Sequence, residues 1–321
     1  MDQWNELLRQ FPEGFRELFS KVELDFQKIR EIRIRAGREA VFRFGEKEYF
    51  LLPNGKLTCQ IERGQKFYEQ DIKKLIEYMG SYSLYAYEEE LRQGFLTIKG
   101  GHRVGIAGKV VLEKGRVKNF KYISSVNIRI SHEIKGAGDQ ALSYLYDPYG
   151  LCHTLIVSPP GCGKTTLLRD LIRQISNGWG KEPGRNVGVV DERSEIGGCY
   201  LGIPQNDLGV RTDLLDCCPK AEGMMMLIRS MAPDVIAVDE IGKEEDVQAM
   251  ENALRCGCRL LATIHGTCME EIKEKRVLSS FLRDKVFQRF LFLDKAYPTH
   301  GMKSVYNCSF QPIYERGDKN A

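Results

Sequence analysis

One stretch near the middle of the chain, residues 155–170, limits the possible folds more than any other part of the sequence. A short apolar run over 155–157 is typical of a buried strand, and a turn rich in proline and glycine follows it. From Lys164 onward, leucine and isoleucine recur at helical spacing. Strand, glycine-rich loop, lysine, hydroxyl residue and helix, in this order, are the parts of a phosphate-binding P-loop. The residues expected to contact a nucleotide are Ser158, Pro159, Pro160, Gly161, Cys162, Gly163, Lys164, Thr165 and Thr166.

The chemistry expected of this loop follows from its residue types. Gly161 and Gly163 lack a Cβ atom, so the backbone can curl and direct successive N–H groups at an anion. The N-terminal end of the following helix adds its positive dipole at the same place. Lys164 would bind the β- and γ-phosphates of ATP, and the Thr165 hydroxyl would bind Mg²⁺.

Ser158 departs from the P-loop pattern G-x-x-x-x-G-K-[ST], which has glycine at this first position. A serine is acceptable there if its φ angle is negative, and Pro159 and Pro160 stiffen the entry to the loop. We therefore interpret the stretch as a variant P-loop. The alternative is a glycine-rich turn that happens to precede a helix.

A second motif begins at Val235, where four apolar residues are followed by Asp239 and Glu240. This is the pattern of a Walker-B strand, in which the first acid holds Mg²⁺ through water and the second polarises the attacking water. We expect Asp239 to bind the metal and Glu240 to be catalytic. The alternative is an acidic strand end that caps the next helix.

Other candidate catalytic residues lie at strand ends and in loops of the same region. Glu192 follows an apolar strand over 186–191 and could be a second acid near the γ-phosphate. His265 ends a predicted strand over 259–265 and could sense that phosphate, although a histidine at a strand end is more often a surface residue. An arginine donated across a subunit boundary could stabilise the transition-state charge, or each arginine could form a surface ion pair. The candidate arginines are Arg193, Arg211 and Arg229.

The pattern of predicted elements changes near residue 136 and indicates two domains. Residues 1–135 combine helices with alternating strands, as over 31–44, which is typical of a smaller α+β domain; they contain no catalytic constellation. Residues 136–321 alternate strands with helices, the pattern of an α/β domain with a mainly parallel sheet. Gly136 and Gly138 mark the expected hinge.

Composition favours a globular protein of a reducing, cytoplasmic compartment. The ten cysteines lack the C-x-x-C spacing with further Cys or His partners that zinc sites use. No apolar run approaches the ~20 residues of a membrane span, and the acidic start is not a secretory signal. The net charge is only +3, but residues 1–135 carry 25 Lys and Arg against 19 Asp and Glu. This excess could face an anionic membrane, a polyanion or an acidic partner, or simply be a solvated surface.

Together, these motifs resemble those of the bacterial stage III sporulation protein AA family, which is related to the type II/IV secretion ATPases. The segments that carry the resemblance span nearly the whole chain and are residues 31–38, 97–108, 158–166, 189–195, 229–242 and 262–266. The resemblance implies a RecA-like ATPase domain that binds ATP and Mg²⁺. It also implies an N-terminal domain that packs against the ATPase domain of a neighbouring subunit.

The resemblance implies roles for individual residues as well. Glu192 falls where secretion ATPases have their Asp-box acid, and His265 falls where they have their His-box histidine. Asp239 departs from the secretion enzymes, which commonly have glycine before the Walker-B glutamate. The choice between Glu240 and Glu192 as the main base stays open.

By this resemblance, the protein is expected to hydrolyse ATP as a ring-shaped homo-oligomer, a hexamer, at the mother-cell face of the forespore membrane. It would drive a secretion-like channel built from other stage III sporulation proteins and would associate with the membrane through such a partner. The alternatives are a nucleotide-dependent nucleic-acid remodelling ATPase and an ATP-binding scaffold with dispensable hydrolysis. We expect no direct nucleic-acid binding, because few residues follow the last predicted strand and a single-strand-binding domain would need more.

Overall fold

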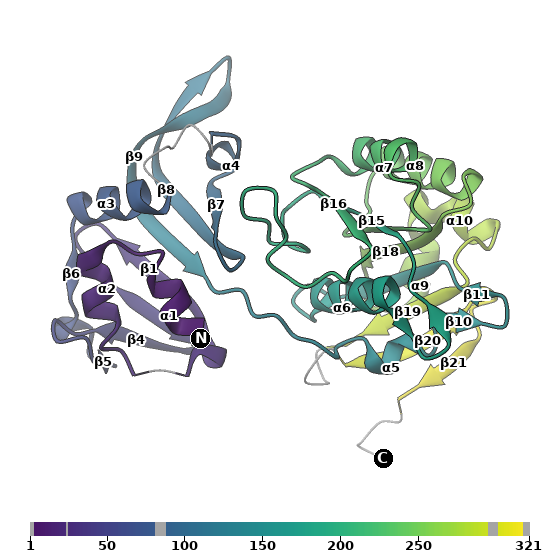
Figure 1. Ribbon diagram of the computed structural model, residues 1–321, viewed down its shortest axis with the longest axis horizontal. Coiled ribbons are helices and arrows are strands. Elements are labelled where there is room, and N and C mark those ends of the chain that lie inside the picture. The colour runs from purple at the N-terminus through teal and green to yellow at the C-terminus, as the bar shows by residue number, and fades with distance from the viewer. Residues whose placement is uncertain (1–2, 24, 81–87, 295–300, 317–321) are drawn as a thin grey trace. The chain divides into compact units, whose positions relative to one another are not determined.

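The computed structural model describes residues 3–23, 25–80, 88–294 and 301–316, and the chain divides into two compact units (Figure 1). Unit 1 comprises Met1–His132 and Gly198–Gln205, and unit 2 comprises Glu133–Gly197 and Asn206–Ala321. The short segment Gly198–Gln205 packs with unit 1, although the sequence analysis assigned it to the second domain. Each unit is described by itself below.

Unit 1 is built on an antiparallel sheet of seven strands in the order β5-β4-β3-β1-β9-β8-β7. Ile32 and Ile34 of β1 are fully buried while the arginines between and after them are partly exposed, as expected from the alternation of side chains along a strand. The strands are β1 (Ile29–Arg35), β3 (Val41–Phe44), β4 (Lys47–Leu51), β5 (Leu57–Thr58), β7 (Phe95–Ile98), β8 (His102–Glu113) and β9 (Arg116–Arg129), with a separate pair β2 (Arg38–Glu39) and β6 (Lys66–Phe67). The helices are α1 (Gln3–Leu8), α2 (Glu13–Phe19), α3 (Glu69–Met79) and α4 (Glu88–Arg92).

Unit 2 is built on an eight-stranded sheet in the order β16-β15-β17-β18-β12-β19-β20-β21. The strands from β16 to β19 in this order are parallel, and β20 and β21 continue the sheet antiparallel. The predicted α/β fold with a mainly parallel sheet is thus confirmed. The strands are β12 (Thr154–Ser158), β15 (Val187–Asp191), β16 (Thr212–Asp216), β17 (Val235–Val238), β18 (Arg259–His265), β19 (Arg289–Leu293), β20 (Met302–Asn307) and β21 (Pro312–Glu315), with short pairs β10 (Tyr146–Asp147) with β11 (Gly150–Leu151) and β13 (Gly178–Trp179) with β14 (Glu182–Pro183).

Helices cover both faces of the unit 2 sheet, and alternate side chains of β12 pack against the helices on opposite faces. Ile156 belongs to the core that packs under α6, whereas Leu155 and Val157 belong to the core under α7 and α8. All five residues of β12 are buried, as expected for a central parallel strand. The helices are α5 (Asp139–Leu142), α6 (Lys164–Asn177), α7 (Lys220–Ser230), α8 (Glu244–Arg255), α9 (Met269–Glu274) and α10 (Ser279–Arg283). Within the described residues, no helix has both the length and the hydropathy needed to span a bilayer.

Parallel pairing brings the predicted motifs to one edge of the sheet. The C-terminal ends of parallel strands lie at the same edge, where ligands of α/β folds commonly bind. Ser158 at the end of β12 is paired in register with His265 at the end of β18. Asp239 and Glu240 directly follow β17, which neighbours β18. The P-loop, the two acids and the histidine therefore meet at this edge.

Candidate functional site

The loop between β12 and α6 has the backbone shape expected of a phosphate-binding loop. Gly161 and Gly163 have φ angles of +75° and +85°, in the left-handed region that glycine adopts without steric cost. Helix α6 begins immediately afterward at Lys164. Ser158 is the buried last residue of β12 and does not adopt a positive φ, and its hydroxyl donates to the Pro159 carbonyl at 2.8 Å. Serine is therefore sterically acceptable at the first loop position.

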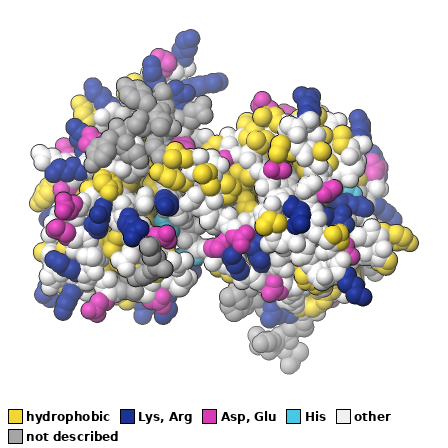
Figure 2. Space-filling view, in the orientation of Figure 1, with side chains coloured by type: hydrophobic (Ala, Val, Ile, Leu, Met, Phe, Trp, Pro, Cys, Tyr) yellow, Lys and Arg dark blue, Asp and Glu magenta, His cyan; other side chains and the backbone are white. Residues whose placement is uncertain are grey.

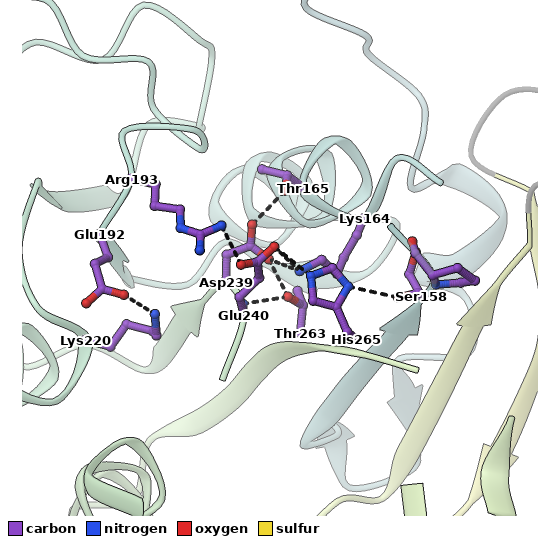
Figure 3. Close-up of polar contacts among 11 residues, drawn as sticks. Ser158, Lys164, Thr165, Glu192, Arg193, Lys220, Asp239, Glu240, Thr263 and His265 are labelled. Carbon is purple, nitrogen blue, oxygen red and sulfur yellow. Dashed lines mark hydrogen bonds and ion pairs between the residues drawn. The ribbon is translucent and has the colours of Figure 1, made fainter. Parts of the chain in front are cut away.

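The loop lysine lies against both acids that follow β17. The Nζ atom of Lys164 is 3.0 Å from Oδ1 of Asp239 and 3.3 Å from Oε1 of Glu240 (Figure 3). The Thr165 hydroxyl donates a hydrogen bond to Oδ2 of Asp239 at 2.6 Å. Burial raises the pKa of Asp239, but the Lys164 charge and hydrogen bonds from Thr165 and Thr263 outweigh this effect, so the pKa is lowered. Asp239 is thus held as a carboxylate.

Thr263 of β18 fixes the positions of both acids. Its hydroxyl donates to Oδ1 of Asp239 and accepts a hydrogen bond from the backbone N–H of Glu240 at 2.9 Å. The side chain is fully buried. Thr263 was not among the predicted site residues. Its bridging role depends on the parallel pairing of β17 with β18, which no local pattern specifies.

Two further side chains, those of Arg193 and His265, contact the Glu240 carboxylate. Nη1 of Arg193 lies 2.7 Å from its Oε2, and Nε2 of His265 lies 3.0 Å from its Oε1. The other ring nitrogen of His265 is 3.3 Å from the Ser158 carbonyl oxygen. Figure 3 shows these side chains gathered around the two acids. The structure therefore brings together Lys164, Glu240, Arg193 and His265 in a single subunit.

Glu192 lies apart from this cluster. Its carboxylate forms an ion pair with Lys220 at the start of α7, and Figure 3 shows this pair separated from the acids beside Lys164. The Lys220 side chain is largely buried, which limits its freedom to leave. Lys220 was not among the predicted site residues, and nothing in its sequence context distinguishes it from other lysines.

Asp191, which precedes Glu192, organises the loop that carries Glu192 and Arg193. Its carboxylate accepts backbone N–H groups of three residues, 195–197, at 2.8–2.9 Å. The buried Arg169 of α6 donates to the carbonyls of residues 195 and 196 and ties the same loop to the P-loop helix. Burial raises the pKa of Asp191 to about 6 despite these hydrogen bonds. Asp191 was not among the predicted site residues, because its sequence context indicates only the end of a strand.

The two remaining candidate arginines lie outside the cluster. Arg211 donates a hydrogen bond to the carbonyl of Ser176. Ser176 is twelve residues after Lys164 in α6, so at 1.5 Å per residue the two lie ~18 Å apart along the helix. Arg229 is exposed in the last turn of α7, where it forms no hydrogen bond or ion pair with a described residue. Neither contacts the site within its own subunit, so their predicted action across a subunit boundary stays a prediction.

The site fits a nucleotide with a magnesium ion. Although Lys164 Nζ is buried within ion-pair distance of two carboxylates, neither accepts a hydrogen bond from it in good geometry. A phosphate oxygen would provide that acceptor, next to left-handed glycines and a helix N-terminus. Thr165 and Asp239 supply oxygen ligands of the kind Mg²⁺ prefers, and Mg²⁺ usually completes its shell with phosphate and water.

The fold resembles those of solved ATPases. The ATPase DotB of Yersinia pseudotuberculosis matches with a TM-score of 0.57 at 13% identity, over 88% of this chain and 75% of that one. The pilus retraction motor PilT, solved with bound ADP, matches with a TM-score of 0.52 at 16% identity, over 82% and 74% of the respective chains. At such low identity the likeness concerns the fold alone, and it confirms the predicted RecA-like class.

The sequence itself matches a family over nearly its full length. The family described as Sporulation stage III, protein AA, matches residues 1–311. Stage III sporulation protein AA of Bacillus subtilis (strain 168) is 40% identical over 310 residues, which are 94% of this chain and 95% of that protein. The family suggested by the sequence motifs is therefore confirmed, and the chain belongs to the sporulation stage III protein AA family.

Proposed function

We propose that the protein is a Mg²⁺-dependent ATPase that acts as a ring-shaped homo-oligomer, a hexamer, in sporulation. The observation that carries this proposal is the contact of Lys164 and Thr165 with Asp239 and Glu240 at the carboxyl edge of the unit 2 sheet. The matching structures, an ATPase and a pilus retraction motor, support a motor role. The partners would be other stage III sporulation membrane proteins, at the mother-cell face of the forespore membrane.

The residues divide the work of hydrolysis between them. Lys164 would leave its position between the acids and bind the β- and γ-phosphates, while Thr165 and Asp239 would hold Mg²⁺, which neutralises developing charge on the phosphates. Glu240 would orient a water molecule and accept its proton. Its carboxylate is engaged by Arg193 and His265, so both contacts would have to loosen before Glu240 acts as a base.

The geometry favours Glu240 over Glu192 as the base. Glu240 lies 3.3 Å from the phosphate-binding lysine, whereas Glu192 is neutralised by the largely buried Lys220. Glu192 therefore lies away from the position at which the phosphates would bind, whereas Glu240 lies beside it. Glu192 would then serve to position α7 and the loop that carries Arg193.

The nucleobase and ribose need a place beside the phosphate loop. A pocket of about 470 Å³ lies within unit 2, and its lining includes Ile134, Gln140, Leu167, Met302 and Arg316. Leu167 is on the first turn of α6, directly after the loop. We place the base and ribose in this pocket. A wider hollow of about 590 Å³ lies in unit 1 and contains none of the predicted site residues.

Three substitutions test the proposal by separating nucleotide binding from turnover. Glu240→Gln is expected to lower ATP turnover by ~10²-fold or more while leaving binding of a fluorescent ATP analogue intact, because the amide cannot accept the proton. Lys164→Ala is expected to abolish both. Glu192→Gln is the matched control and should retain most turnover. Full turnover in Glu240→Gln together with its loss in Glu192→Gln would move the base to Glu192, and turnover in Lys164→Ala would contradict the site altogether.

A further inference from the structure

The strands β8 and β9 of unit 1 continue beyond their neighbours as a two-stranded ribbon. Pairing of β8 with β7 ends at Gly105, and pairing of β9 with β1 ends at Ser125. Within the described residues, strand pairing over 108–123 is confined to β8 and β9 themselves. We call residues 108–123 the basic ribbon. Figure 1 shows it projecting from the rest of unit 1. Arg92 of α4 donates a hydrogen bond to the Lys118 carbonyl at 3.2 Å, and Phe120 and Ile123 pack against the unit 1 core. The other side chains of the ribbon are exposed.

The charged residues of the basic ribbon are almost all positive. The single acid is Glu113, and it forms an ion pair with Lys118 at 2.7 Å. Figure 2 shows Lys and Arg side chains gathered around the tip. The basic residues are Lys109, Lys114, Arg116, Lys118 and Lys121, which leaves a net charge of +4 on the ribbon. The basic excess noted in the first part of the sequence is thus concentrated at a projecting element, where it would act on a partner surface.

Apolar side chains are exposed between these charges. Leu112 is 61% exposed two residues before Lys114, and Tyr122 is 62% exposed opposite Lys109. Val110, Val111 and Val117 are each more than one third exposed. Exposed aliphatic and aromatic groups interleaved with lysine and arginine are the composition of elements that lie in the headgroup region of a membrane.

The edges of the ribbon are unsuited to pairing with a strand of another protein. The register between β8 and β9 shifts at three points, which leaves Lys118, Lys121 and the adjoining Ser124 as extra residues opposite β8. Bulges and edge lysines are features that discourage strand addition. A lipid surface, in contrast, requires no matching strand and can surround a narrow ribbon from several sides. The observations therefore favour lipid over a protein strand as the partner.

We propose that the basic ribbon docks unit 1 directly onto a membrane rich in anionic lipids. Lysine and arginine would bind lipid phosphates, while Leu112 and Tyr122 would enter the interfacial region between headgroups and acyl chains. This contact needs no partner protein and no hydrolysis, so it is independent of the proposed ATPase activity.

Vesicle flotation of the full chain tests the proposal. The wild type is expected to float with vesicles containing phosphatidylglycerol but not with pure phosphatidylcholine, at an ionic strength of about 0.1 M. Substituting four ribbon residues should weaken partitioning at least about tenfold. A control that removes four exposed charges elsewhere in unit 1 should bind like the wild type. The ribbon set is Lys109→Gln, Lys114→Gln, Arg116→Gln and Lys121→Gln, and the control set is Lys47→Gln, Lys56→Gln, Lys73→Gln and Lys74→Gln.

The Leu112→Ser variant distinguishes binding to a lipid membrane from binding to other polyanions, because it removes an apolar side chain and keeps every charge. It should weaken vesicle binding at least about threefold through loss of the inserted aliphatic group. Circular dichroism and thermal unfolding of each variant should match the wild type, since the substituted side chains are exposed. Equal loss in the control set, unchanged binding of the ribbon set, or full binding of Leu112→Ser would overturn the proposal. Absence of vesicle binding by the wild type would also overturn it and would favour an acidic protein as the partner.

Discussion

Glu240 is held in a backbone conformation that is unusual for a residue with a side chain. Its φ angle is +55°, and the Thr263 hydroxyl accepts its N–H. Such strain persists only where the surroundings determine it, and it is common at functional sites. Burial raises the pKa of Glu240, but Lys164 and Arg193 lower it further than burial raises it. The carboxylate is therefore fixed in place and kept ionised, but the cations that lower its pKa also weaken it as a base, so they must move away before Glu240 accepts a proton.

Replacing Thr263 by valine tests this positioning with little change in volume. The variant leaves the Glu240 N–H without its partner, which costs about 1–3 kcal/mol for a buried group, and removes one of the two contacts of Asp239 Oδ1, which keeps Lys164. We expect turnover to fall by at least about tenfold and the Mg²⁺ concentration for half-maximal activity to rise, because both acids lose their alignment. Thr263→Ser should restore most of the loss. Unchanged Mg²⁺ dependence and turnover in Thr263→Val would show that the acids do not need this bridge.

Asp191 provides a prediction of pH dependence. Its pKa in the folded protein is about 6, above the ordinary value of 3.8. Between these values the folded state keeps a proton that the unfolded state has lost, so the free energy of unfolding falls as pH rises from about 4 to 6. Two pKa units correspond to a decrease on the order of 3 kcal/mol. Above pH 6 this contribution is constant.

The comparison of wild type with Asp191→Asn isolates this effect. Both proteins would carry Trp4→Phe, so that fluorescence of Trp179 reports unfolding of unit 2 by urea. The free energy of unfolding of the protein that retains Asp191 is expected to fall, relative to that of the Asp191→Asn variant, as pH rises from about 4 to 6. Parallel pH profiles for the two proteins would show that Asp191 titrates normally.

The site residues that could be predicted from the sequence are those whose roles follow from the spacing of a local motif. Lys164 and Thr165 follow a glycine loop, and Asp239 and Glu240 follow an apolar strand, so their chemistry could be predicted without tertiary information. Lys220 could not be found this way, because its role is a contact with Glu192 that joins a helix start to a distant loop. The same holds for Asp191, whose partners are backbone groups in a loop without a recognisable pattern.

At the scale of elements, the turn from loop to helix at Gly163 is the most demanding backbone feature of the site. An alanine there would place a Cβ in the left-handed region at +85°, at a cost of about 1–2 kcal/mol. We expect Gly163→Ala to destabilise unit 2 and to weaken binding of an ATP analogue. Gly14→Ala is the matched control: it lies within α2, has open space around it, and should stabilise unit 1 by about 0.4–1 kcal/mol.

Proteins with a single tryptophan allow the effects of Gly163→Ala and Gly14→Ala on stability to be measured separately. Trp4 reports unit 1 in a Trp179→Phe background, and Trp179 reports unit 2 in a Trp4→Phe background. A Gly163→Ala protein with wild-type stability and nucleotide binding would show that the left-handed turn is not required. Destabilisation of unit 1 by Gly14→Ala would show that the helix does not tolerate the added methyl group.

Elements with strong periodicity were predicted well, and weakly patterned ones were missed. The strand β12 and helix α6 have unambiguous apolar patterns. The edge strand β16 has the sequence Thr-Asp-Leu-Leu-Asp, is only partly buried along its length, and was not predicted. Segment Gly198–Gln205 packs with unit 1 through contacts such as the Gln205 side chain accepting the Gly100 N–H. Such long-range packing leaves no periodic trace in the sequence.

In the proposed ring, a neighbouring subunit would add an arginine to the site beside Glu240. Arg193 already contacts Glu240 in the same subunit, and Arg211 is bound to the Ser176 carbonyl. Arg229 is exposed and makes no hydrogen bond or ion pair with a described residue. We therefore expect Arg229 to act across a subunit boundary, where a guanidinium can stabilise the transition-state charge.

Mixing of two inactive variants tests this expectation. Arg229→Ala and Glu240→Gln should each lack turnover alone, because each ring would lose one half of every site. In a random equimolar mixture of subunits, about a quarter of the boundaries combine an intact Glu240 with an intact Arg229, so up to about a quarter of wild-type turnover should return. The matched pair Lys164→Ala with Glu240→Gln should recover nothing, because both residues belong to one subunit's site. Absence of recovery with Arg229→Ala would contradict the assignment of Arg229 as the arginine that acts in trans, and recovery in the Lys164→Ala pair would show that the mixing assay does not distinguish residues of one subunit from residues of two.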